Sequence, residues 1–214
     1  MFLAMARWAP DTPQRLQAAA MTLFAERGYA ATTVPEITAR AGLTTRTFFR
    51  HYADKREVLF AGEDELPEVV ARVFAQAPAE LTPIEVVAQG LRTVVAPRFD
   101  DQRAYFRARR DIVHSGIALQ EREAHKLAAL ARSATIGFTV RGLSPLQAGI
   151  AAALAVSVYD AALQLWLDGD SAATFAEAVT MAVDALNDIH PGQPIKPAHS
   201  TPPHQAVTDT HISA

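Results

Sequence analysis

A short segment of this chain is rich in side chains that donate hydrogen bonds: Thr45, Arg46, Thr47 and Arg50. A guanidinium group can donate two hydrogen bonds to guanine, and a threonine can bond several bases or pack against a thymine methyl group. Three further side chains nearby suit contacts with phosphate oxygens, namely Thr33, Thr44 and Lys55. These residue types indicate contact with nucleic acid, provided that the surrounding elements place them on one face.

The surrounding spacing predicts two short helices joined by a tight turn. Thr33 is followed three residues later by Glu36, which is the signature of a capping box at a helix start. Gly42 ends that helix because glycine tolerates a left-handed backbone. Thr44 then caps a second helix, predicted from Thr45 to about Tyr52. This is the helix-turn-helix pattern, whose second helix enters the major groove with its N-terminal residues.

Further helices are expected on both sides of this unit. One is predicted over residues 12–27, with Asp11 or Thr12 as its cap. Another begins at Lys55 behind the cap Asp54. Half of the whole chain is apolar, and its many alanines and few β-branched runs favour an all-helical protein of about nine helices.

Charge is unevenly distributed along the chain. Residues 1–56 hold eight lysines and arginines against four acids, which gives +4. Because the net charge is −3, residues 57–214 carry −7. A basic N-terminal part on an acidic remainder is expected when one end meets phosphate, although many domains differ this much by chance.

The helix-turn-helix segment resembles the DNA-binding domain of the TetR (tetracycline-repressor-like) transcription regulators over about residues 12–60. The resemblance rests on Phe24, Gly28, Tyr29, Thr32, Thr33, Val34, Ile37, Ala41, Gly42, Leu43, Thr44, Phe48, Phe49, His51, Tyr52, Lys55, Val58 and Leu59. It implies a homodimeric, all-helical repressor, occasionally an activator, whose variable C-terminal domain binds a small molecule and changes the spacing of two DNA-binding heads. The implied DNA-contacting residues are Thr33, Thr44, Thr45, Arg46, Thr47, Phe49, Arg50, His51 and Lys55.

Three positions depart from the family pattern. Relatives usually carry tyrosine at Phe49, where the hydroxyl often meets a phosphate, and phenylalanine cannot make that bond. We therefore favour a packing role for Phe49 over a contact with DNA. Alanine is usual at Thr38 and phenylalanine at Tyr52. These differences concern individual contacts and leave the expected fold unchanged.

The chain is expected to divide into a DNA-binding head (residues 1–56), a ligand-binding and dimerisation body (57–189) and a disordered tail (190–214). The tail holds five prolines and four histidines among polar residues. No motif identifies the body, but helical patterns are predicted at about 83–96, 101–114, 118–140, 145–167 and 172–189. Pro67 indicates a kink or a fresh helix start before residues 69–75.

The last two predicted helices form an αα-hairpin. The helix at 145–167 is apolar nearly all round, so it needs burial on two sides. With the helix at 172–189 it resembles the pair through which TetR-type proteins dimerise as a four-helix bundle. The alternative is a hairpin that packs only within one chain.

A ligand pocket is expected between the helices at 101–114, 118–140 and 145–167. Its candidate lining residues are Phe106, Arg110, His114, His125, Phe138, Tyr159 and Trp166. The abundance of Ala, Leu and Val indicates a mostly apolar ligand. Arg110 and His114, one helical turn apart, either face inward and hold an anionic group or form surface salt bridges.

Nothing in the sequence indicates an enzyme. It contains no P-loop, GxSxG, HExxH or cysteine nucleophile, and no cofactor motif. A helical metal centre would need paired motifs, and only Asp111-x-x-His114 approaches one, so no metal is expected. The longest apolar run, Ile150–Val158, is too short to span a membrane. With no signal peptide found, a cytoplasmic regulator is expected. A small-molecule carrier or enzyme that retains the head, or a ligand-independent repressor, stays open.

Overall fold

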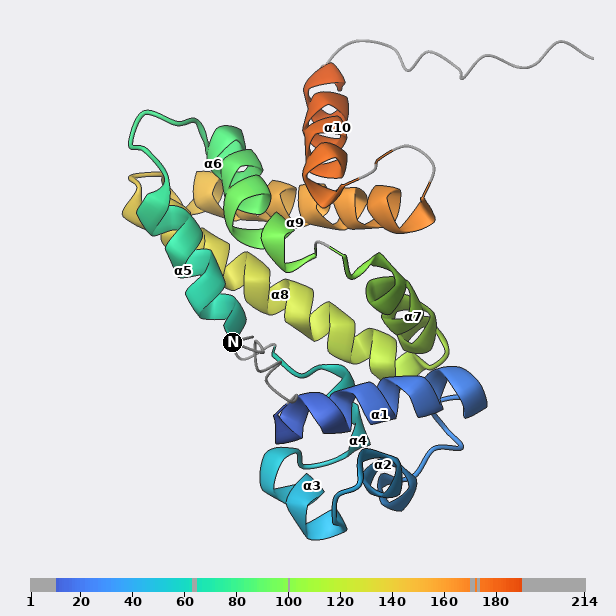
Figure 1. The fold of residues 1–214 in the computed structure, drawn as a ribbon. Helices are drawn as coiled ribbons and strands as arrows, with labels where there is room; N and C mark the ends of the chain where they lie inside the picture. Colours follow the sequence, from blue (N-terminus) through green and yellow to red (C-terminus); the bar gives the residue numbers. More distant parts are fainter. Residues whose placement is uncertain (1–10, 63–64, 100, 170–171, 173, 190–214) are drawn as a thin grey trace, which may run out of the picture.

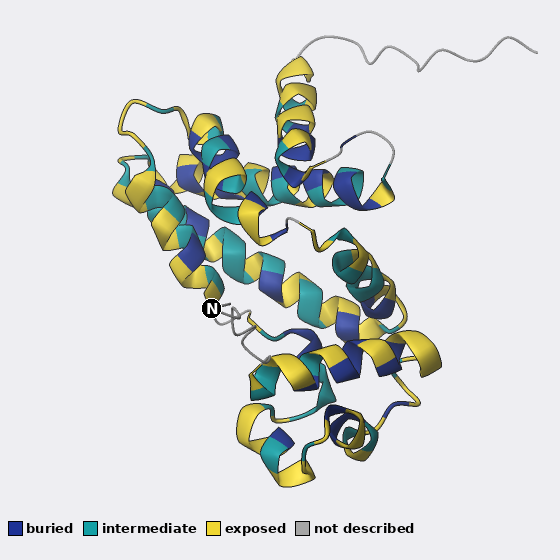
Figure 2. Cartoon of the chain, viewed as in Figure 1, coloured by how far each residue is buried: buried dark blue, intermediate teal, exposed yellow. Residues whose placement is uncertain are grey.

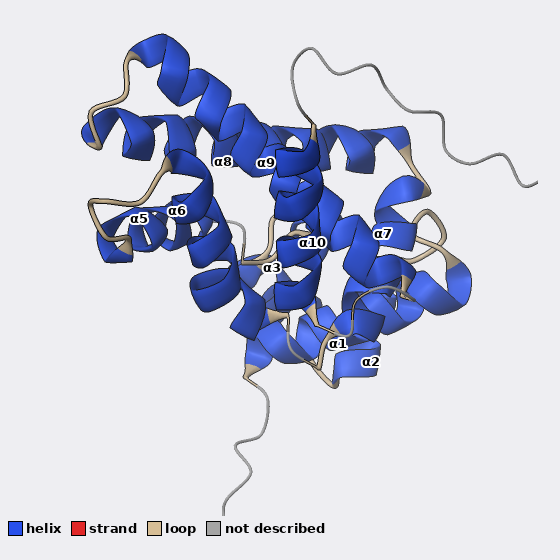
Figure 3. Cartoon of the chain, turned by 90° about the horizontal axis from the view of Figure 1, so that it is seen from above, coloured by secondary structure: helices blue, strands red, loops and turns tan. Residues whose placement is uncertain are grey.

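The computed structural model describes residues 11–62, 65–99, 101–169, 172 and 174–189, and within them the chain is helical without a strand (Figures 1 and 3). The all-α prediction is confirmed. The α-helices are α1 (Thr12–Arg27), α2 (Val34–Ala41), α3 (Thr45–His51), α4 (Lys55–Leu59), α5 (Leu66–Gln76), α6 (Pro83–Gly90), α7 (Arg103–His114), α8 (Ile117–Val140), α9 (Pro145–Asp168) and α10 (Phe175–Asp188). The predicted disordered tail at 190–214 lies outside the described residues.

Among the described residues there are ten α-helices rather than about nine, because the helix that starts at Lys55 ends at Leu59. A new helix, α5, begins at Leu66 and has Pro67 in its first turn. A proline is tolerated there because the first backbone N–H groups of a helix have no intrahelical acceptor. Of the two interpretations of Pro67, the fresh helix start is confirmed.

Local capping sets the boundaries of the head. Asp11 accepts a hydrogen bond from the Gln14 backbone at 3.0 Å and starts α1. Thr33 and Glu36 form the expected capping box of α2. Gly42 ends α2 with φ +64°, a left-handed conformation that costs a side-chain-bearing residue about 1 kcal/mol or more. Two hydrogen bonds of 2.6 and 2.8 Å from Arg40 to Glu26 then hold α2 against α1.

The core of the head extends into the body. Leu16, Phe24 and Phe48 are fully or almost fully buried in one cluster. The same cluster includes buried residues from α7 and the start of α8: Ile112, Val113 and Leu119. Because one apolar core joins these elements, α7 and α8 are packed directly on the helices of the head (Figure 1).

The helix predicted over about 83–96 has a different ending from the one expected. The α-helical part, α6, stops at Gly90 and continues as a π turn, η2 (Leu91–Val95), and a 3-10 turn, η3 (Ala96–Arg98). Pro97 lies in η3 and has no N–H to donate to the residue four positions earlier, which disfavours a regular α-helix here. The helical path therefore runs past Pro97 to Arg98.

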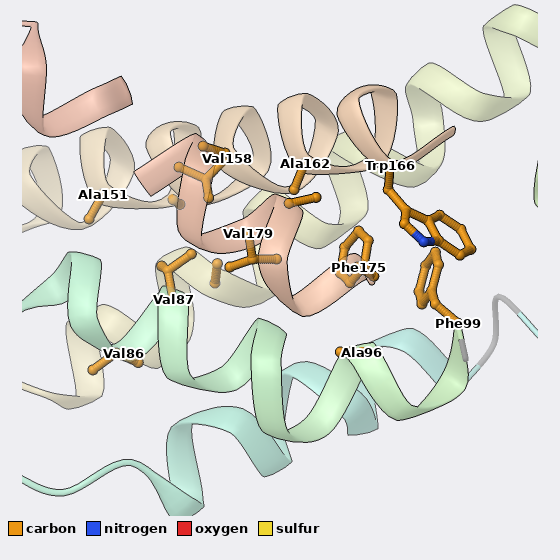
Figure 4. Close-up of a cluster of buried hydrophobic side chains, with 14 of the residues drawn as sticks. Val86, Val87, Ala96, Phe99, Ala151, Val158, Ala162, Trp166, Phe175 and Val179 are labelled. Atoms are coloured by element: carbon orange, nitrogen blue, oxygen red, sulfur yellow. The ribbon is translucent and has the colours of Figure 1, made fainter. Parts of the chain in front are cut away.

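A second core holds the body together. Phe99 stacks on Phe106 and on Phe175, with ring centroids 4.3 and 4.4 Å apart, and Trp166 meets Phe99 edge-on (Figure 4). Small residues of α9, such as Ala152 and Ala162, are buried in the same cluster and allow close helix approach. The helix α10 crosses α9 steeply rather than lying antiparallel to it (Figures 1 and 3).

One face of α9 is apolar but uncovered. Leu146 is 75% exposed, and Ile150 and Leu154 follow it at intervals of four residues with exposed side chains. In the described chain, α9 is the helix long and apolar enough to span a membrane, and 28% of its apolar window is buried. Because its other face forms part of the body core, membrane insertion is not needed to explain its composition. The exposed stripe is a contiguous apolar patch on a helix whose other face is packed.

Candidate nucleic-acid interface and ligand cavity

The short helix α3 presents the polar side chains singled out in the sequence. Figure 2 shows that much of α3 is exposed. Thr45, Arg46 and Arg50 are exposed, and Thr47 is half-buried. Phe48 points the other way and is fully buried, which fixes the rotation of the helix. Arg46 and Arg50 therefore project from the outer face of a helix anchored through a single aromatic side chain.

Several other cations of the head are engaged within the protein: Arg15, Arg27, Arg40, Lys55 and Arg56. For Arg46, the structure of the described head shows neither an ion pair nor a hydrogen bond. Arg50 approaches only the neighbouring His51 ring, at 3.4 Å, and His51 is exposed beside it. The positive charge available to a polyanion is thus concentrated on α3.

Phe49 is not a packing residue, and the interpretation favoured from the sequence is wrong on this point. Its side chain is 58% exposed, and its main aromatic neighbour is Phe48, with ring centroids 5.4 Å apart. Successive residues on an α-helix are about 100° apart, so a neighbour of the inward-pointing Phe48 is turned toward solvent. Phe49 consequently lies on the same outer surface as Arg46 and Arg50.

Lys55 is turned into the head. Its ammonium donates hydrogen bonds to the carbonyl oxygens of Tyr29, Ala30 and Thr32 at 2.7, 3.2 and 2.8 Å. It also lies 4.5 Å from the centre of the Tyr29 ring. The Lys55 ammonium thereby holds the loop between α1 and α2 in place. This geometry does not support the predicted phosphate contact, because the donors already have acceptors within the chain.

Two threonines predicted as phosphate contacts serve as helix caps and stay exposed. The Thr33 hydroxyl donates to Glu36 at 2.8 Å, and its backbone N–H donates to the same carboxylate. The Thr44 hydroxyl lies 2.9 Å from that of Thr47 and accepts from the Thr47 backbone at 3.1 Å. Both hydroxyls sit at the starts of the two helices, where an approaching backbone phosphate could reach them.

The body contains a cavity of about 680 Å³. Five of the seven predicted lining residues border it: Phe106, Arg110, His114, Phe138 and Tyr159. Most of the remaining lining is aliphatic or aromatic, with Val69, Val73 and Phe74 from α5 among it. A volume of this order is typical of sites for drug-sized ligands.

The other two predicted lining residues do not border the cavity. His125 is exposed, because it lies on the solvent side of α8. Trp166 is almost fully buried, but it packs against Phe99 and Phe175 (Figure 4). Phe106 meets the same ring, with centroids 6.0 Å apart. The Trp166 ring also receives the Arg103 guanidinium at 5.2 Å. Trp166 therefore supports the cavity wall from behind.

Arg110 and His114 do not act together. Arg110 forms a salt bridge of 2.7 Å with Asp168 and a hydrogen bond of 3.0 Å with Gln164, which ties α7 to the end of α9. His114 is exposed at the end of α7. The geometry favours the salt-bridged interpretation of Arg110 over an inward-facing anion site made with His114.

A wall that the sequence interpretation missed comes from α5 and the segment before it. Ala61 and Gly62, just after α4, border the cavity together with Leu66 of α5. Further lining residues come from α6 and the π turn, including Val87, Leu91 and Val95. The apolar residues of α5 recur at helical spacing, a signal that could have indicated a buried face. Nothing in that pattern distinguishes a cavity wall from a filled core.

At one end of the cavity lies a charged cluster that also escaped the sequence interpretation. Lys126 is 9% exposed and forms an ion pair with Glu123, whose other oxygen accepts from Arg109 at 2.9 Å. Burial raises the pKa of the Glu123 carboxyl, but Lys126 and Arg109 lower it by more, so its pKa lies below 4.5. Glu123 is thus held as a carboxylate between two cations.

The sequence family described as "Bacterial regulatory proteins, tetR family" matches residues 16–61, from within α1 to just past the end of α4. A curated relative is the HTH-type transcriptional regulator TcmR of Streptomyces glaucescens, 32% identical over 84 residues. The match covers 39% of this chain and 37% of that protein's length. The detectable sequence likeness thus concerns little more than a third of either protein.

Solved structures share the fold over most of the chain. The SmeT–triclosan complex has a TM-score of 0.60 at 20% identity and covers 88% of this chain and 99% of its own. Thermus thermophilus FadR, a TetR-family repressor in complex with lauroyl-CoA, has a TM-score of 0.51 at 21% identity and covers 88% and 100%. At such identities the likeness shows the arrangement of head and body and no more.

Proposed function

Because the chain belongs to the TetR family of bacterial regulatory proteins, we propose that it represses transcription as a homodimer bound to a palindromic operator. A small, largely apolar molecule that enters the body cavity would release it. The observation that carries this proposal is the combination of an exposed, cationic α3 with a cavity of about 680 Å³ bordered by the segment after α4. DNA contact and ligand contact are thereby linked through one short helix.

For the DNA contact, α3 would lie in the major groove with Thr45 and Arg46 foremost. Arg46 suits a bidentate contact with guanine, and Arg50, Thr33 and Thr44 suit phosphate oxygens. Phe49 and His51 complete the outer surface, where an apolar ring can pack against thymine methyl groups or sugars. Lys55 contributes by holding the α1–α2 loop rather than by direct contact.

The proposed dimer uses the uncovered face of α9 together with α10. Leu146, Ile150 and Leu154 offer an apolar stripe that a second copy can cover by two-fold symmetry. The two heads then face successive major grooves about 34 Å apart. A cavity that changes shape on binding would alter that spacing, so ligand and operator would compete through two states of one dimer. Such a regulator would act in the cytoplasm.

The test is a selection of bound sequences from random DNA, followed by footprinting on the DNA that flanks its own gene. We expect a palindrome with half-site centres about 10 base pairs, or a multiple, apart. Binding should weaken steeply with salt, since phosphate contacts release counterions. A protein that binds no DNA at low salt would instead be a carrier or enzyme that retains the head.

A ligand-independent repressor is the remaining alternative. It predicts that molecules filling the cavity leave operator affinity unchanged. Two proteins of similar fold carry small molecules in their solved structures, triclosan in SmeT and lauroyl-CoA in FadR, which supports a responsive body here. A screen of apolar compounds by thermal shift, followed by operator release for each hit, separates the two possibilities.

A further inference from the structure

The cavity has a polar end and an apolar end, which α8 displays along its length. Its lining residues near the start of α8 are Gln120, Glu123 and Lys126, and those further along are Leu127, Leu130, Ala134 and Phe138. At 1.5 Å per residue, Glu123 and Phe138 are about 22 Å apart along the helix axis. The site is therefore shaped for a molecule whose two ends differ in polarity.

The charge of the cavity lining is opposite to that of the protein. Its described lining includes four cations, namely Arg98, Arg109, Arg110 and Lys126, against two carboxylates, namely Glu123 and Asp160. The chain as a whole carries −3. Arg98 is exposed and pairs with Glu65, and Arg110 pairs with Asp168. The buried positive charge therefore rests on Arg109 and Lys126, which share one carboxylate, Glu123. Two cations against one carboxylate favour an anion over a neutral or cationic guest, because charges interact more strongly where water is excluded.

Building on the proposed ligand response, we propose that the cavity binds an amphiphilic molecule with one anionic group, and that Arg109 and Lys126 bind this group in exchange with Glu123. Glu123 already occupies a place where both cations stabilise a carboxylate. A ligand carboxylate that takes over these contacts satisfies the same donors, while Glu123, which is partly accessible, turns toward water. The apolar remainder of the ligand lies along α8 between α5 and α9.

The same cluster connects the cavity with the helix that follows the DNA-binding unit. Arg109 donates through Nε to the carbonyl oxygen of Leu59, the last residue of α4, at 3.3 Å. Its guanidinium also lies 4.9 Å from the centre of the Phe60 ring. An anion that draws Arg109 toward the cavity weakens this hold on α4. The anionic group is thus the part of the ligand that acts on the head, and the apolar part supplies affinity.

The experiment compares matched carboxylates and alcohols on the full-length protein without DNA, so its outcome does not depend on the operator. Calorimetry at pH 7.5 measures the dissociation constants of decanoate and decan-1-ol, and of 2-naphthoate and 2-naphthylmethanol. In at least one pair the carboxylate should bind about tenfold or more tighter than its alcohol, the usual gain from a charge-assisted hydrogen bond. An uncharged apolar cavity would prefer the alcohol, which is the less water-soluble partner.

Variants identify the responsible charges. Lys126→Met should abolish the preference for the carboxylate, and Glu123→Gln should raise carboxylate affinity several-fold because the competing anion is gone. Arg132→Met, on the exposed side of α8, should leave all four constants unchanged. Three results would overturn the proposal. The first is equal binding of carboxylate and alcohol, the second is binding of none of the four probes, and the third is a carboxylate preference that survives Lys126→Met. Should Lys126→Met fail to fold, unchanged carboxylate affinity in Glu123→Gln would overturn it instead.

Discussion

Arg46 is the side chain on which base preference should depend most. It is exposed on α3, and its guanidinium is not committed to any partner in the described head. Arg46→Ala should cost about 1–3 kcal/mol of operator affinity and relax the preference at one base pair per half-site. Fluorescence anisotropy on the selected operator and on its single-base variants measures both effects. Arg72→Ala, on the exposed side of α5, is the control and should bind like wild type.

Lys55 should matter for stability rather than for the salt dependence of DNA binding. Lys55→Met leaves three carbonyl oxygens without their charged donor, which should lower the free energy of unfolding by about 1–3 kcal/mol. Urea denaturation measures this, with the exposed Arg50→Met as control. If stability is unchanged while the slope of log affinity against log salt falls by about one, Lys55 is a phosphate contact after all.

These two residues also show how far sequence reasoning reaches. Caps such as Thr33 and Asp54 were predictable because a cap depends only on residues two to three positions away. The direction of Lys55 was not, since its acceptors lie 23 to 26 residues earlier in the chain. The packing role favoured for Phe49 was wrong for a related reason: a short helix has one inward position here, and Phe48 occupies it.

The helices α5 and α8 approach each other closely at Gly137. A β-carbon added there would lie 2.4 Å from Cδ2 of Phe74, a ring that borders the cavity. Gly137→Ala should therefore destabilise the body by about 1–3 kcal/mol through overpacking, even though alanine favours helix. Thermal and urea unfolding measure the change.

The double variant Gly137→Ala/Phe74→Leu is the matched test of that explanation. Its smaller side chain makes room for the new methyl group, so part of the lost stability should return in a double-mutant cycle. If the two substitutions simply add, the loss in Gly137→Ala has another origin, and the close approach of α5 and α8 is not its cause.

The arrangement of the body helices explains why the cavity was only half predictable. Helical periodicity correctly indicated that Phe106, Phe138 and Tyr159 face inward. It could not distinguish Trp166, which fills a cluster, from Tyr159, which borders a void, because both are inward positions of α9. That difference depends on α5 and the π turn, which pack there from a distant part of the sequence.

Acid should lower the free energy of unfolding of the whole protein, and part of this loss should come from protonation of Glu123. Its folded-state pKa lies below the ordinary 4.5, so the carboxylate contributes stability above pH 4.5 that is lost as pH falls through the folded value. The unfolding free energy of wild type should therefore decline below pH 4.5. Glu123→Gln should show a shallower decline when urea unfolding is measured from pH 7 to pH 3.

Other carboxyl groups also contribute to the loss of stability at low pH in that measurement. Glu26, Glu36 and Glu85 also have lowered pKa values, from hydrogen bonds with Arg40, Thr33 and Thr82. They are present in both proteins, so only the difference between the two curves belongs to Glu123. Parallel curves would mean that the buried ion pairs of Glu123 do not persist in solution.

The assembly should depend on the exposed stripe of α9. Leu154→Glu places a charge in the middle of the proposed four-helix interface, where it has no partner. We expect the dimer to dissociate into monomers at micromolar concentration, with loss of binding to DNA that carries two half-sites. Size-exclusion chromatography with light scattering measures the mass. Arg132→Glu, which places a glutamate on the exposed side of α8, should remain dimeric.

The π turn has a consequence for how such a pocket can diversify. Val87, Leu91, Val95 and Phe99 all border the cavity at intervals of four residues. On a regular α-helix that interval drifts around the axis by about 40° per step, so the fourth residue would point away. The wider turn at Leu91–Val95 absorbs the drift and keeps the four side chains in phase. A one-residue deletion there would rotate half of this wall at once, a larger change of ligand shape than any single substitution could make.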